Sequence, residues 1–191
     1  MVFTYSTKAE MGVGTLIIFI ALLLVAAVAA GVLIQTSGSL QQQALSTGSQ
    51  ATGQISTNAA VVEVSAIDGQ DGSVDQFYVI MRLAPGSDPI RLTDVTYTIS
   101  TANTSQSLQY TDNSSEVGTS FFGVEYLQEG ENSLPGTLTR GDVVELTFNT
   151  TRSITESETM RLNFIPRIGT ATLTQFSLPD VMSTQRVYLY P

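Results

Sequence analysis

The feature that most constrains this chain is an uncharged stretch near its N-terminus. No Asp, Glu, Lys or Arg occurs between residues 11 and 62 of the 191-residue sequence. Residues 13 to 34 read VGTLIIFIALLLVAAVAAGVLI, and as an α-helix this apolar run would span about 33 Å. That length is enough to cross the hydrocarbon layer of a membrane. Taken alone, the run is typical of a single-pass membrane anchor.

The apolar pattern continues beyond this run at lower density. In residues 35 to 62 it recurs at steps of three, four or seven, at Leu40, Ala44, Ala51, Ile55, Ala59 and Val62. This spacing predicts that the helix continues with one narrow apolar stripe. An exposed polar helix would normally carry Glu and Lys pairs, which are absent here, so we expect the helix to be buried along its whole length. A chain of this size has too little other protein to bury it, so other copies must do so.

After Glu63 the pattern alternates with a period near two, which predicts β-strands rich in Val, Ile, Thr, Tyr and Phe. The expected strands are Val61–Ile67, Gln76–Leu83, Ile90–Ser100, Ser107–Thr111, Thr119–Leu127, Asp142–Thr150, Met160–Pro166, Ala171–Leu178 and Gln185–Tyr190. Turn signals such as DGQDG at 68–72 and APGSDP at 84–89 separate them. The predicted fold class is α+β: a long N-terminal hydrophobic α-helix followed by an all-β, Ig-like Greek-key sandwich over residues 63–191.

The composition argues against several classes of function. The net charge is −9 and only eight side chains are positive, so the chain lacks the basic footprint that a nucleic-acid partner requires. It has no His and no Cys, so catalytic sites built on those residues cannot form. No motif indicates carboxylate-only chemistry. We therefore predict neither enzymatic activity nor a cofactor, with calcium as the one exception considered below.

A specific motif lies near the N-terminus and leads into the apolar run: Lys8-Ala9-Glu10-Met11-Gly12-Val13-Gly14-Thr15-Leu16. It resembles the N-terminus of archaellins, the archaeal flagellins, which belong to the type IV pilin superfamily. Supporting similarities lie at 84–90, at 141–146 and in the final Leu189-Tyr190-Pro191. The resemblance implies that residues 1–9 are a class III (prepilin-type) leader peptide. A membrane aspartyl peptidase would remove this leader between Ala9 and Glu10, one residue after the basic Lys8.

By the same resemblance, residues 10–62 form the filament-core helix, with core positions at Gly12, Gly14, Leu16, Phe19, Leu23, Ala27, Gly31 and Ile34. The implied function is a structural subunit of the archaellum, which polymerises through this helix into a helical filament for swimming motility. The implied partners are other copies of the chain, paralogous archaellins, the prepilin-type peptidase, a membrane assembly platform with its motor ATPase, and an N-glycan transferase. The precursor would lie in the cytoplasmic membrane and the filament outside the cell.

Three asparagines are candidate modification sites. Asn103, Asn113 and Asn149 each begin an Asn-x-Ser/Thr triplet, the acceptor pattern for N-glycosylation. Because archaellins are often glycosylated, the resemblance implies that at least one of the three is modified.

Three aspartates form a candidate calcium site. Asp68, Asp71 and Asp75 lie close together in a Gly-rich segment, and with backbone carbonyls they could hold Ca²⁺. The segment lacks the EF-hand pattern, so a solvated turn is the alternative interpretation.

Two other functions remain open at this point. An archaeal type IV adhesion pilin would share the leader and the helix. A membrane-anchored binding module would instead retain its anchor, stay monomeric and offer a concave site with convergent polar groups.

Overall fold

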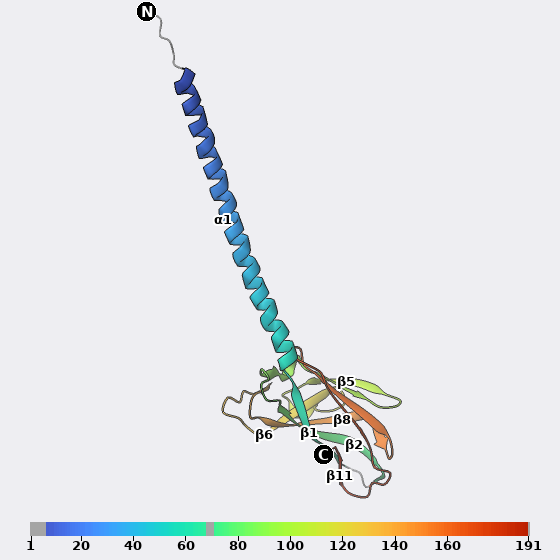
Figure 1. Ribbon diagram of the computed structural model, residues 1–191. Helices are drawn as coiled ribbons and strands as arrows, with labels where there is room; N and C mark the ends of the chain where they lie inside the picture. Colours follow the sequence, from blue (N-terminus) through green and yellow to red (C-terminus); the bar gives the residue numbers. More distant parts are fainter. Residues whose placement is uncertain (1–6, 68–70, 191) are drawn as a thin grey trace, which may run out of the picture. The chain divides into compact units, whose positions relative to one another are not determined.

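The computed structural model describes residues 7–67 and 71–190 (Figure 1). The chain divides into two compact units, residues 1–50 and residues 51–191. The first unit contains most of a single long helix. The second contains the last turns of that helix and an all-β domain. These elements agree with the predicted fold class.

The helix α1 (Thr7–Ser56) contains the whole apolar run but ends at Ser56 rather than at Val62. Residues 59–62 instead begin strand β1 (Ala59–Ile67), in which Ala59 pairs with Leu83 and is 1% exposed. The predicted continuation of the helix to Val62 was therefore wrong. Apolar residues three apart satisfy the helical spacing, but the backbone of this segment pairs with a neighbouring strand, and that tertiary pairing overrides the local pattern.

Two loops, which contain Ser87 and Gly169, contact the chain just after the helix ends. We term this set of residues the helix-exit clamp; it consists of Thr57, Asn58, Ser87 and Gly169. The Ser87 hydroxyl accepts a hydrogen bond from the Asn58 amide at 2.9 Å, and two backbone carbonyl oxygens lie within 3.1 Å as acceptors for its proton. Gly169 has a φ of +121°, and a Cβ at this position would lie 2.6 Å from the Thr57 carbonyl oxygen. Only glycine fits such a close approach. The last turn of α1 is thus fixed to the β-domain.

In the described residues after β1, ten further strands follow: β2 (Ser73–Leu83), β3 (Ile90–Arg91), β4 (Thr96–Ser100), β5 (Ser105–Tyr110), β6 (Phe121–Gln128), β7 (Thr137–Leu138), β8 (Val143–Thr155), β9 (Thr159–Ile165), β10 (Thr172–Ser177) and β11 (Arg186–Tyr190). Each predicted strand has a counterpart. The strand predicted at 90–100 is divided by a short 3₁₀ helix, η2 (Leu92–Asp94), and β7 is too short to leave an alternating pattern.

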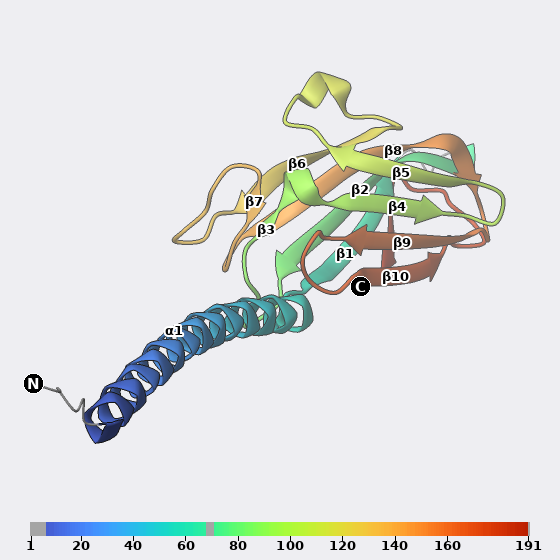
Figure 2. The same ribbon diagram turned by 90° about the horizontal axis from the view of Figure 1, so that it is seen from above.

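The strands hydrogen-bond in the order β10-β9-β4-β5-β6-β8-β2-β1-β11, with β3 and β7 as a separate pair. The junction of β5 and β6 is parallel and joins two residue pairs, Gln109–Phe121 and Tyr110–Phe122. At this short junction the order divides into a four-stranded sheet (β10-β9-β4-β5) and a five-stranded sheet (β6-β8-β2-β1-β11), which form the two layers in Figure 2. The chain crosses between them after β2, β5, β8 and β10, which is a Greek-key type of connection.

Aromatic side chains fill the space between the two sheets. The Tyr97 ring from β4 lies 5.4 Å from the Phe148 ring of β8, 6.0 Å from Phe122 and 6.3 Å from Phe164, measured between centroids. Phe148 also stacks on Phe77 at 5.7 Å. All five rings are at most 1% exposed, so residues from both layers share one core. This core makes the β-domain a sandwich.

Candidate assembly surface

Residues 11–34 of α1 form a continuous apolar surface, which we term the apolar helix surface. Its fifteen large apolar side chains are between 48% and 74% exposed; they are Met11, Val13, Leu16, Ile17, Ile18, Phe19, Ile20, Leu22, Leu23, Leu24, Val25, Val28, Val32, Leu33 and Ile34. Successive residues of an α-helix point about 100° apart, so these side chains cover every side of the helix. A helix that is apolar on all sides belongs in a membrane or inside a larger assembly.

The free energy at stake is large. Full burial of one large apolar side chain is worth roughly 1.5–3 kcal/mol, so hiding this surface from water is worth on the order of 20–40 kcal/mol. By length and composition, α1 is also able to cross a membrane, and the apolar window of this helix is 0% buried within the chain. The chain thus carries a surface that needs lipid or other protein around it.

The hydroxyl groups within this region are compatible with such surroundings. Thr15 donates to the carbonyl oxygen of Gly12 at 2.9 Å, and Thr36 donates to the carbonyl oxygens of Val32 and Leu33 at 2.9 and 3.0 Å. A hydroxyl satisfied by its own helix can be buried without the penalty of an unmade hydrogen bond. Together with the absence of charge, this removes the main polar obstacle to burying residues 11–34, and Thr36 just beyond them also has its hydroxyl satisfied.

Four glycines of α1 have no close neighbour within the described part of the chain. A Cβ at Gly12, Gly14, Gly31 or Gly38 would meet no atom within 4 Å, and none of these residues has a positive φ. Glycine in a helix interior costs roughly 1 kcal/mol relative to alanine. Small residues of this kind allow the close approach of a second helix. We infer that their packing partner lies in another molecule.

The predicted cleavage residues Lys8, Ala9 and Glu10 belong to the described part of α1 as backbone, while residues 1–6 lie outside the described residues. The cleavage site therefore stays a prediction. The predicted core positions all lie on α1; the large ones, Leu16, Phe19, Leu23 and Ile34, are exposed members of the apolar helix surface.

The structure separates the three glycosylation candidates. Asn103 is exposed in the turn between β4 and β5. Asn113 is also exposed, but its side chain accepts from the Ser115 amide at 3.1 Å and donates to Glu116 at 3.2 Å. Asn149 is half-buried within β8, and its Oδ1 atom has no hydrogen-bond partner among the described residues. Asn103 is therefore the exposed candidate whose side chain has no hydrogen bond among the described residues.

The candidate calcium residues are only partly placed. Asp68 lies outside the described residues, whereas Asp71 and Asp75 are exposed. Among the residues that are described, no group of three or more metal-binding side chains comes together. The calcium site stays a prediction.

The pattern of residues does not predict the contacts of the helix-exit clamp. Ser87 lies in the turn signal at 84–89, and Gly169 lies in a short connection before β10. The available sequence signal is that each loop contains a small residue. Neither loop's own sequence indicates that these residues contact Thr57 and Asn58.

Comparison with known proteins gives one consistent result. A family model described as archaeal-type flagellin matches residues 9–176. Flagellin B1 of Thermoplasma volcanium is 45% identical over 108 residues, which cover 54% of this chain and 44% of that protein. Flagellin B2 of Methanocaldococcus jannaschii is 32% identical over 209 residues, covering 97% of this chain and 96% of that one. The solved archaeal flagellum of Methanospirillum hungatei strain JF1 has a similar fold, with a TM-score of 0.71 at 18% identity, over 94% of this chain and 99% of that chain.

Proposed function

Because this chain belongs to the archaeal-type flagellin family and is a structural filament subunit, we propose that α1 builds the core of an archaellum filament by packing against the same helix of other copies. The observation that carries the proposal is the apolar helix surface, which is exposed on every side of α1. A bundle of like helices would cover this surface. The acidic β-domain would form the part that faces water, since excess charge keeps a solvated surface from associating nonspecifically.

The assembly pathway follows from the same surface. Before processing, residues 13–34 would lie in the cytoplasmic membrane with Lys8 on the cytoplasmic side, in line with the positive-inside tendency. The prepilin-type peptidase would then cut between Ala9 and Glu10. Transfer of the helix from lipid directly into the helix bundle keeps its apolar side chains away from water throughout. A membrane assembly platform with its motor ATPase would carry out this transfer and rotate the filament.

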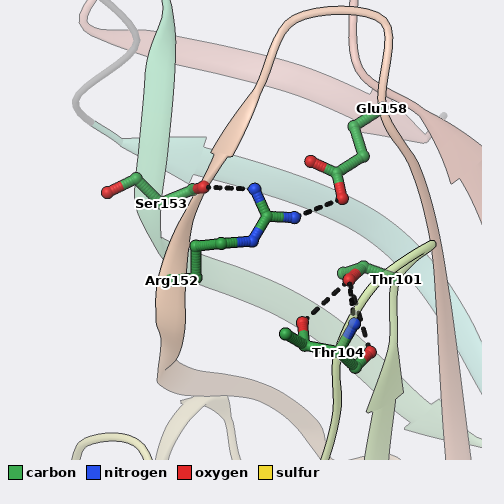
Figure 3. A network of polar contacts seen from close by, with 5 residues as sticks. All are labelled: Thr101, Thr104, Arg152, Ser153 and Glu158. Carbon is green, nitrogen blue, oxygen red and sulfur yellow. Dashed lines mark hydrogen bonds and ion pairs between the residues drawn. The ribbon is translucent and has the colours of Figure 1, made fainter.

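The β-domain would carry the N-glycan, and Asn103 is the favoured acceptor because its side chain is exposed. Figure 3 shows the turn that holds it: Thr101 and Thr104 bond to each other through their hydroxyls at 2.8 Å, and the Thr104 amide donates to the Thr101 hydroxyl at 3.2 Å. Arg152 in the same view donates to Glu158 and to the Ser153 carbonyl oxygen. The bonds between Thr101 and Thr104 hold the turn on which the Asn103 side chain is exposed.

The proposal is tested by separating membrane insertion from helix packing. Gly31→Leu keeps the helix apolar and meets no atom of its own chain, but it blocks close approach by a second helix. We expect the precursor to reach the membrane in normal amounts while the yield of sheared filaments falls strongly, as seen by electron microscopy and by blotting of membrane and filament fractions. Leu33→Ile is the matched control and should form normal filaments.

A processed wild-type chain that stays monomeric in detergent-free buffer, with α1 intact, would refute the proposal. So would filaments of normal length and number from the Gly31→Leu chain. Peptide mass mapping of the filament subunit checks the processing step separately, with Glu10 expected as the first residue.

A further inference from the structure

Positive charge is scarce in this protein, so the contacts of each arginine are informative. Three of its seven arginines form ion pairs and a fourth donates to a glutamine; they are Arg152, Arg167, Arg186 and Arg161. Within the described part of the chain, the side chains of Arg82, Arg91 and Arg140 have neither an ion pair nor a hydrogen bond. Two of these three, Arg82 and Arg140, lie in one place.

Arg82 and Arg140 line a groove of about 660 Å³ at one end of the five-stranded sheet, which we term the arginine groove (82–86, 128 and 140–143). Leu83, Ala84 and Pro85 contribute apolar surface to it. Its one carboxylate, Asp142, already accepts hydrogen bonds from the Gly130 amide at 2.7 Å and from the Thr139 amide and hydroxyl at 2.8 Å. Among the residues that the structure describes, neither guanidinium group therefore has a partner, and both lie beside an apolar surface.

A second segment of the β-domain has the opposite character. The loop of residues 111–120, which contains the short 3₁₀ helix η3 (Ser114–Glu116), carries the exposed carboxylates Asp112 and Glu116. Asp112 accepts from the Tyr110 hydroxyl at 3.2 Å, and Glu116 accepts from Thr111 and Asn113, both at 3.2 Å. Neither carboxylate has an ion pair among the described residues. These neighbours hold the two charges in place before any partner arrives, which lowers the entropic cost of binding.

We propose that the arginine groove receives the η3 loop of a second copy of this chain, as a contact between β-domains in the filament. Guanidinium groups match carboxylates geometrically through paired N–H donors, and two of each are available. The two segments occupy different places on the domain: Asp112 and Ser114 line a separate hollow, and Figure 2 shows the loop with η3 standing away from the strands. A contact between two different patches is heterologous, and when it does not close into a ring it continues into an open helical polymer.

This contact would be additional to the helix core and rests on the proposed filament function. It would also reduce a repulsion that the filament has to overcome. The chain carries 17 acidic and eight basic side chains, so neighbouring β-domains in a filament repel each other unless their few free cations meet carboxylates across the contact.

A charge swap tests the pairing in the full chain, expressed in place of the wild type. Arg82→Glu combined with Arg140→Glu is expected to reduce filament yield by about tenfold, which corresponds to about 1.4 kcal/mol. Adding Asp112→Arg and Glu116→Arg to that chain should restore the yield, because the charges then match again. Arg91→Glu with Arg161→Glu changes the net charge equally at other sites and is expected to leave the yield near that of the wild type.

A crosslinking experiment identifies the occupant of the groove. The chain has no cysteine, so Arg140→Cys and Glu116→Cys can be introduced together without competing thiols. Treating intact filaments with a short bismaleimide should give a ladder of covalent oligomers, because each copy offers both halves of the contact. Either cysteine alone should give no ladder.

Two results would overturn the proposal: full filament yield from the chain with both arginines reversed, or no ladder in filaments of the double-cysteine chain. A reversed chain that the swap fails to rescue would count against the η3 loop as the occupant. All three outcomes leave filament formation by the wild type intact, so they are distinguishable from a failure of the proposed function.

Discussion

Removing the Asp142 carboxylate should destabilise the β-domain by an amount that its hydrogen bonds allow to be estimated. Asp142 is 1% exposed and binds the Gly130 amide, the Thr139 amide and the Thr139 hydroxyl. Alanine at this position leaves both amides without their acceptor, at about 1–3 kcal/mol for each buried donor. Because the Gly130 bond is only partly buried, we expect a loss in the lower part of the resulting range, about 2–4 kcal/mol, which for a domain of this size lowers the melting temperature by roughly 6–12 °C.

The assay is thermal unfolding of the full chain in detergent micelles at pH 7, followed by circular dichroism in the β-sheet region. Asp142→Asn keeps one acceptor oxygen and should lose about half as much as Asp142→Ala. Asp88→Asn changes an exposed carboxylate and serves as the matched control. An unchanged melting temperature for Asp142→Ala would show that the segments around Gly130 and Thr139 do not depend on the Asp142 carboxylate for their stability.

The pH dependence provides a second check. Burial alone would raise the pKa of Asp142, but the hydrogen bonds from Gly130 and Thr139 outweigh it and hold the pKa below its ordinary value of 3.8. Because the folded-state pKa is lowered, the stabilisation is fully present above about pH 4 and is lost as the pH falls through the folded-state value. The difference between wild type and Asp142→Asn should therefore shrink toward pH 2. A gap that persists there at full size would refute the role assigned to the charge.

Three further predictions concern other parts of the domain. Burial raises the pKa of Glu145, with help from the nearby Glu125 and Glu63 carboxylates and despite the opposing effect of Arg186. The stability of the wild type should therefore decline as the pH rises through the raised pKa. Glu145→Gln should melt about 1–3 °C higher than the wild type at pH 7 but not at pH 3. Gly169→Ala should lower the melting temperature by roughly 6 °C or more, because its Cβ would lie 2.6 Å from the Thr57 carbonyl oxygen at a φ of +121°; wild-type melting would contradict the clamp. Asn103→Gln should lower the intact mass of the filament subunit by one glycan, and an unchanged mass would exclude this acceptor.

The sequence predicted the strands well because each alternates between the core and the solvent. In β8, buried Val144, Leu146 and Phe148 alternate with half-buried residues, and that period of two is visible in the sequence alone. The exact end of the helix was not predictable in the same way. Ala59 and Val62 are three residues apart, which fits a helical spacing. The backbone of Ala59 instead pairs with Leu83 of β2, and this pairing between segments that are distant in the sequence decides the structure.

The candidate sites also differ in whether their residues are consecutive in the sequence or come from distant segments. The apolar helix surface is a property of consecutive residues, so composition was enough to find it. The arginine groove joins residues 82–86 with residues 140–143, and the helix-exit clamp joins residues 57–58 with residues 87 and 169. Contacts between such distant segments depend on strand order and register, which no local pattern encodes.

The glycines of the β-domain and those of the helix differ in whether their own chain explains them. In the β-domain, Gly130 and Gly169 are required by their own chain, since a Cβ would lie 2.3 Å from the Arg140 carbonyl oxygen and 2.6 Å from that of Thr57. In the helix, Gly12, Gly14 and Gly31 meet nothing within 4 Å, so each weakens the isolated helix with no compensating contact in the chain. Under the proposed function, that loss would be recovered when the helix of another copy approaches at those positions. The filament would then stabilise α1, whereas the β-domain is stabilised by contacts within the single chain.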